Sequence, residues 1–114
     1  LCDRRQRQMC IRDSYNVKTA TDDINIAKQI TKSLLEKRLV SSVQQKEITS
    51  IWWWNNELEE SKEYVLEMKT KKSLYKEVEQ EIKKIHSYEV PEIYAEEIKE
   101  ASKEYLDWID ETTK

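Results

Sequence analysis

The only histidine of the chain, His86, is the side chain best suited to bind a metal ion. Neutral imidazole is a common ligand for copper and zinc, and a nearby carboxylate can complete part of such a site. Glu89 and Glu92 follow closely, and the turn at Pro91 could fold Glu92 back toward the histidine. We therefore identify His86, Glu92 and Glu89 as candidate ligands for copper(II) or another divalent metal. The alternative is that His86 caps a helix and bonds locally, while both glutamates are solvated or paired with lysines.

Three consecutive tryptophans, residues 52–54, form a second feature. Neighbouring residues of a strand point to opposite sides, so at least one of these rings must point away from the core of a monomer. One interpretation is a core that continues into a subunit interface, where aromatic residues concentrate. The other is a ligand cleft between subunits, lined by Trp52 and Trp54 with the polar neighbours Lys69, Tyr88 and Tyr105.

Several classes of function are disfavoured by composition. The chain has no glycine, which excludes the glycine-rich phosphate loop, the dinucleotide-binding turn and the nucleophile elbow. No nucleophile lies beside a base, so we expect no catalytic residue. The net charge is −3 and basic residues are interspersed with acids, which argues against nucleic acid or an anionic membrane as a partner.

The length of 114 residues is enough for one domain, and equal shares of hydrophobic and charged residues, 38% each, predict a thin core. Such a domain gains from burying apolar surface in an oligomer. No apolar run approaches the roughly 18–20 residues that span a bilayer. An apolar secretory leader is also lacking, so we expect a cytoplasmic protein.

Residues 1–14 differ from the rest in composition. They hold four of the five arginines and both cysteines, Cys2 and Cys10, whereas all fifteen lysines lie in residues 15–114. Residues 9–14 also resemble the translation of a transposon end used to prepare sequencing libraries. We predict that residues 1–14 are a non-native segment, an assembly artefact, and that residues 15–114 form the domain. The alternative is a genuine basic arm that binds partners.

The first half of the domain shows alternating strand and helix signals. Residues 15–19 are β-prone, and residues 22–38 have the apolar spacing of a helix. Strand signals follow at residues 40–45, 48–54 and 64–70. Asn55-Asn56 provides the hairpin turn, because asparagine tolerates positive φ better than the other residues here.

The second half begins with a helix that we expect Ser73 to cap. Its apolar stripe is Leu74, Val78, Ile82 and Ile85, with Glu77, Glu79 and Glu81 on a solvated face among lysines. Pro91 ends the following turn, and residues 92–98 form a strand. Ser102 should cap a last helix that buries Tyr105, Leu106, Trp108 and Ile109.

This order, β-α-β-β-α-β with a terminal helix, predicts an α+β fold of the ferredoxin-like split β-α-β type. An antiparallel sheet would then carry two helices on one face, with the extra helix at the C-terminal end.

Several ordered motifs resemble those of the CutA divalent-cation tolerance family. Residues 86–93 match the family's H-P-Y-E-V-P-E-I except at Ser87, and residues 105–108 match Y-L-x-W. Residues 49–54 resemble its T-S-I-Y-x-W strand, and Lys69-Thr70 its I-K-T strand end. The chain is similar from about Tyr15 to Thr113.

The resemblance implies a PII-like homotrimer packed around a threefold axis, a role in the response to divalent metals, chiefly copper, and ligand sites in intersubunit clefts. The family's cysteines are replaced, apparently by Lys18 and Ser42, and its V-P-G turn by residues 45–47, so a thiolate-assisted copper site is not implied. We expect no cofactor to be required for folding. The alternative function is a PII-like trimeric signalling or scaffold protein without a metal requirement.

Overall fold

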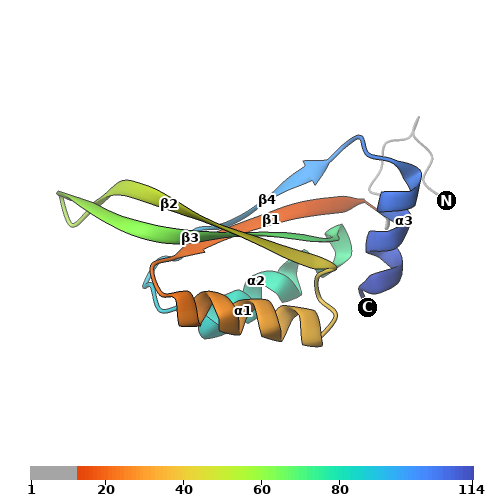
Figure 1. The fold of residues 1–114 in the computed structure, drawn as a ribbon, viewed down its shortest axis with the longest axis horizontal. Coiled ribbons are helices and arrows are strands. Elements are labelled where there is room, and N and C mark those ends of the chain that lie inside the picture. Colours follow the sequence, from red (N-terminus) through yellow and green to blue (C-terminus); the bar gives the residue numbers. More distant parts are fainter. Residues whose placement is uncertain (1–12) are drawn as a thin grey trace.

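The structure, a computed structural model, describes residues 13–114 (Figure 1). The prediction of a non-native segment at residues 1–14, with Cys2 and Cys10, lies almost wholly outside these residues and stays a prediction. Ser14 is the first residue of the first strand. The elements in chain order are β1 (Ser14–Thr21), α1 (Ile24–Glu36), β2 (Ser42–Trp54), β3 (Glu57–Lys71), α2 (Tyr75–Ile85), β4 (Ile93–Ile98) and α3 (Lys103–Thr112).

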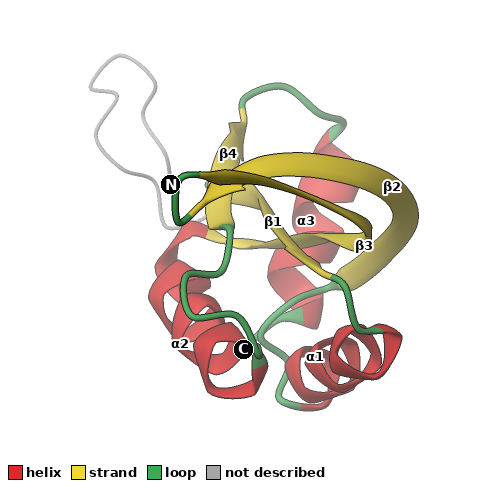
Figure 2. Ribbon diagram, turned by 90° about the vertical axis from the view of Figure 1, so that its left-hand side faces the viewer, coloured by secondary structure: helices red, strands yellow, loops and turns green. Residues whose placement is uncertain are grey.

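The four strands form one antiparallel sheet in the order β2-β3-β1-β4. Helices α1 and α2 cover the same face of this sheet, and α3 lies at the end where β1 begins (Figure 1, Figure 2). The predicted α+β fold with two helices on one face and an extra C-terminal helix is therefore confirmed. None of the helices within residues 13–114 has the length and apolar character needed to cross a membrane.

The core lies between the sheet and its two covering helices. Side chains from alternate positions of β1 and β3 pack against the inner stripes of α1 and α2, as the two backbone periodicities require. Its fully buried members include Val17, Leu66, Met68, Ala27, Ile30, Leu34, Val78 and Ile82.

Helix α1 ends without the glycine that usually completes such an end. Arg38 adopts φ 56°, its N–H donates to the carbonyl of Leu35 at 3.1 Å, and the N–H of Leu39 donates to that of Leu34 at 2.9 Å. This is the Schellman pair of bonds, formed here by a non-glycine residue. The helix ends at Glu36, two residues before the predicted end, and is closed by a residue type that is unfavourable at this position.

The β2–β3 hairpin projects as a two-stranded ribbon beyond the helices (Figure 1). The predicted turn is confirmed, because Asn55 and Asn56 adopt φ values of 52° and 65°. The strands are longer than predicted, since β2 is continuous and β3 begins at Glu57 instead of Tyr64. The acidic residues of early β3 did not interrupt pairing because they are exposed on the ribbon, where charge costs little.

Two expectations about helix ends and faces were wrong. Ser73 does not cap α2, because a 3₁₀ turn over Lys72–Leu74 leads into the helix and no side chain bonds to its first amides. Helix α3 is capped by Ser102 as predicted. Only Ile109 of its expected apolar face is buried, while Trp108 is 41% exposed, because α3 contacts the domain along one narrow stripe.

Candidate functional site

A cleft of about 440 Å³ lies between the β2–β3 ribbon and the loop that follows α2. Residues from three regions line it: Asp22 from the β1–α1 turn, Trp52, Trp54 and Glu59 from the ribbon, and Tyr88, Glu89 and Val90 from the loop. Strand alternation places Trp52 and Trp54 on one face of the ribbon and Trp53 on the other. The cross-strand register sets Glu59 directly opposite Trp52.

His86 holds the loop of this cleft in place. It is the residue that ends α2, and its backbone N–H donates to the carbonyl of Ile82 at 2.8 Å. The N–H of Tyr88 donates to Nδ1 at 3.1 Å, so Nδ1 is the unprotonated nitrogen and Nε2–H donates to the carbonyl of Ala20 at 2.6 Å. Both ring nitrogens are thus engaged within the chain, in line with the helix-cap alternative. A metal ion at His86 would have to replace one of these bonds.

Tyr88 is oriented by a second, partly buried contact. Its hydroxyl donates to Oε2 of Glu63 at 2.7 Å, and only 6% of Glu63 is exposed. Burial, reinforced by this bond and by the charges of Glu63 and Asp22, raises the pKa of Tyr88 well above its ordinary value. The phenol is therefore neutral and acts as a donor at physiological pH, and its ring is fixed beside the cleft.

The structure brings together some of the predicted site residues and separates others. Trp52, Trp54, Tyr88 and Glu89 line one cleft. Lys69 lies opposite Ser42, at the far end of the ribbon, and its Nζ donates to Gln44 at 3.3 Å. Tyr105 lies on α3 and stacks on Trp108, with ring centroids 5.9 Å apart. Within one chain, hairpin register and helix position separate Lys69 and Tyr105 from this cleft. Their place in a cleft between subunits stays a prediction.

The three predicted metal ligands are not assembled within one chain. Glu92 is exposed beyond the cleft-lining residues, and His86 is engaged as described. Within residues 13–114, no three His, Cys, Asp or Glu side chains converge closely enough to hold a metal ion. Metal binding by this set stays a prediction that would need ligands from a second chain.

Asp22, Glu59 and Val90 line the cleft but were not predicted. The position of Glu59 could have been found from the Asn55-Asn56 turn, because a two-residue hairpin turn fixes which residue faces Trp52. Asp22 and Val90 carry no such signal, since they enter the cleft from separate loops. The position of Asp22 depends on the path of the turn between β1 and α1, and that of Val90 on the path of the loop after α2.

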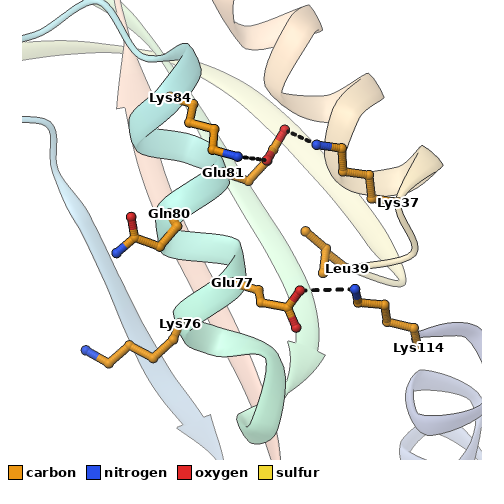
Figure 3. Close-up of a pocket in the computed structure, with 8 residues that line it drawn as sticks. All are labelled: Lys37, Leu39, Lys76, Glu77, Gln80, Glu81, Lys84 and Lys114. Carbon is orange, nitrogen blue, oxygen red and sulfur yellow. Dashed lines mark hydrogen bonds and ion pairs between the residues drawn. The ribbon is translucent and has the colours of Figure 1, made fainter.

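A second cavity, of about 560 Å³, lies between α2, the end of α1 and the C-terminus (Figure 3). Four lysines and two glutamates line it. Glu81 Oε2 accepts from Lys37 at 2.9 Å, and Lys114 pairs with Glu77 at 3.0 Å. Figure 3 shows Lys76 and Gln80 pointing away from these pairs. These pairs join α2 to the end of α1 and to the C-terminus, and they engage both glutamates of the cavity.

The prediction that Glu81 belongs to a solvated face was wrong, because only 8% of this residue is exposed. The hydrogen bond from Ser33, followed by that from Lys37, holds the pKa of Glu81 below its ordinary value of 4.5. A carboxyl whose pKa is lowered by folding stabilises the fold above its unfolded pKa and loses that contribution as the pH falls through the folded value.

We therefore expect the Glu81→Gln variant to lose less stability than the wild type on acidification from pH 7 to pH 3. Urea unfolding midpoints at the two pH values measure this difference. Glu77→Gln is the matched control, since Glu77 lies on the same helix with a half-exposed carboxylate, and its acid dependence should follow the wild type. Identical acid dependence for Glu81→Gln and the wild type would contradict the assignment.

Known proteins of one family match nearly the whole of the described chain. The family model for the CutA1 divalent ion tolerance protein matches residues 15–112. The divalent-cation tolerance protein CutA of Archaeoglobus fulgidus is 43% identical over 86 residues, which cover 75% of this chain and 84% of the relative. That of Pyrococcus horikoshii is 34% identical over 98 residues, covering 86% and 96%.

Solved structures show the same fold. The periplasmic divalent cation tolerance protein CutA from Archaeoglobus fulgidus superposes with a TM-score of 0.86 at 37% identity, covering 89% of this chain and 99% of that one. The divalent cation tolerance protein from Thermus thermophilus gives 0.85 at 35% identity, with the same coverage of both chains. Because the archaeal relative is described as periplasmic, the cytoplasmic location expected from the sequence stays a prediction.

Proposed function

Because this chain belongs to the CutA1 divalent ion tolerance protein family, we propose that it acts in tolerance to divalent cations as a homotrimer. In this proposal the trimer binds a divalent metal such as copper(II), or a small ligand, in clefts that include the aromatic cleft described above. The observation that carries the general function is the family match over residues 15–112, which covers the strands and helices of the domain except Ser14, the first residue of β1. The proposal contains no catalytic step.

Self-assembly is supported by an apolar patch on the ribbon. Ile51, Trp53 and Leu58 are 63%, 69% and 62% exposed. Trp53 lies directly opposite Leu58, and Ile51 shares its side of β2, so the three side chains lie on one face. Large apolar side chains gathered on one exposed surface mark interaction sites. This face is opposite to the one that carries Trp52 and Trp54, so one ribbon could contact a neighbouring protomer and line a cleft at once.

Metal binding in this proposal depends on the assembly. Glu89 lines the cleft with Asp22 and Glu59, and carboxylates are ligands for divalent ions. Since no three suitable side chains converge within residues 13–114, a complete site would combine ligands from two protomers. Glu89 is a better test position than His86, because the ring of His86 is already engaged in holding the loop.

The test is a calorimetric titration of copper(II), and separately of zinc, into the assembled protein. We expect saturable binding by the wild type that Glu89→Gln weakens about tenfold or more. Glu104→Gln, an exposed glutamate on α3, is the control and should bind as the wild type does. A stable trimer that shows no saturable metal binding would refute the metal part and favour the scaffold alternative. A monomer would refute the assembly.

A further inference from the structure

The aromatic cleft has an unusual combination of lining side chains. Three are aromatic, Trp52, Trp54 and Tyr88, and three carry carboxylates, Asp22, Glu59 and Glu89, while no lysine or arginine from residues 13–114 lines it. The faces of aromatic rings attract cations, and tryptophan does so most strongly. Carboxylates also attract cations, and their attraction acts over a longer range. A site of this composition favours a positively charged ligand with apolar surface.

The negative charge of the cleft is not compensated within the described chain. No ion pair among residues 13–114 involves Asp22, Glu59 or Glu89. The second cavity differs in this respect, because Glu77 and Glu81 are both paired with lysines. The buried carboxylate of Glu63, bonded to the hydroxyl of Tyr88, adds a further negative group behind the cleft.

The geometry favours an organic cation over a bare metal ion. A metal requires several donor atoms within about 2.0–2.6 Å, and within the described residues no three suitable side chains meet that need. The carboxylates are instead distributed around a cleft of about 440 Å³. Small-molecule sites have volumes of about 300–1,000 Å³ and are lined by aromatic groups with a few polar ones. The Tyr88 ring is already fixed by its bond to Glu63, so little ordering is needed on binding.

We propose that the cleft binds a small organic cation with an alkylammonium group, held by the rings of Trp52, Trp54 and Tyr88 and attracted by the surrounding carboxylates. The inference rests on the cleft being the ligand site of the proposed function, but it does not require metal binding. The ammonium group would lie against the aromatic side chains, and the carboxylates would offset its charge without direct coordination.

The test compares choline with 3,3-dimethylbutan-1-ol, which has the same shape and no charge. Calorimetry on the full chain in its native assembly should detect binding of choline and not of the neutral alcohol. Trp54→Leu keeps an apolar side chain but removes the aromatic face, and we expect it to weaken choline binding about fivefold to thirtyfold. Trp108→Leu makes the same change on α3, outside the cleft, where the ring is 41% exposed, and should leave the affinity unchanged.

Equal binding of choline and the neutral alcohol would overturn the inference, because the cleft would then be merely apolar. Absence of choline binding by an intact assembly would overturn it too, and would indicate that a neighbouring protomer or another ligand fills the cleft. Copper(II) titration and sedimentation of the same samples separate the two proposals. Metal binding by a trimer that does not bind choline leaves the proposed function standing, whereas choline binding by a monomer refutes the trimer alone.

Discussion

Trp53→Asp should dissociate the assembled protein. Trp53 is 69% exposed on the outer face of the ribbon, beside Ile51 and opposite Leu58. An aromatic side chain at the centre of an interface contributes about 2 kcal/mol or more to association, which corresponds to about 30-fold in the dissociation constant. Aspartate removes that contact and places an unpaired charge in each interface, so the loss should be larger. Sedimentation equilibrium at micromolar concentration measures the change in mass.

The control for this experiment is Leu35→Asp. Leu35 is also an exposed apolar residue, 40% accessible, but it lies on α1 and away from the ribbon. Its variant should sediment as the wild type does. If Trp53→Asp kept the wild-type mass, the ribbon patch would not be the assembly surface. Circular dichroism of each variant shows whether the fold is retained, so that dissociation can be separated from unfolding.

His86→Ala should lower the free energy of unfolding by about 2–4 kcal/mol, and should do so without any metal present. The substitution leaves the buried carbonyl of Ala20 without its donor at Nε2 and removes the acceptor of the Tyr88 N–H. A buried polar group that loses its partner costs about 1–3 kcal/mol, and the space left by the ring adds to this cost. Urea unfolding in the presence of a chelator measures the effect at a fixed protein concentration.

Ser87→Ala is the matched control, because Ser87 is the exposed neighbour of His86 in the same loop. It should change stability by no more than about 0.5 kcal/mol. A stable His86→Ala protein that lost only metal affinity would instead identify His86 as a ligand. The comparison therefore separates a structural role for the histidine from a metal-binding one.

The position of His86 also determines the shape of the cleft. Its ring bonds to the end of β1 on one side and to the first turn of the Tyr88 loop on the other. Tyr88 is then directed to Glu63 on β3, so the loop is held to two different strands. A change at His86 should therefore affect ligand binding as well as stability, although His86 itself does not line the cleft.

The sequence alone was sufficient for the features that depend on short spacing. Backbone preferences and periodicity act over a few residues, so local features were predictable. These are the Asn55-Asn56 turn, the apolar stripe of α2, the end of α2 near His86, and the Ser102 cap of α3. The alternation of the tryptophans likewise predicted that Trp52 and Trp54 share a face, and the structure places both in the cleft.

Only the tertiary structure decided which distant side chains meet. Within one chain, the hairpin register places Lys69 at the far end of the ribbon from Trp52 and Trp54, so only a second subunit could bring it to such a cleft. Glu81 has the helical position of a surface residue, yet Ser33 and Lys37 on or beside α1 bury it. The sequence left His86 as either a metal ligand or a helix cap, and only the structure shows the carbonyl of Ala20 and the amide of Tyr88 at its two nitrogens. Each outcome depends on partners that lie far apart in the chain or on backbone groups common to every residue, which residue types and local spacing do not encode.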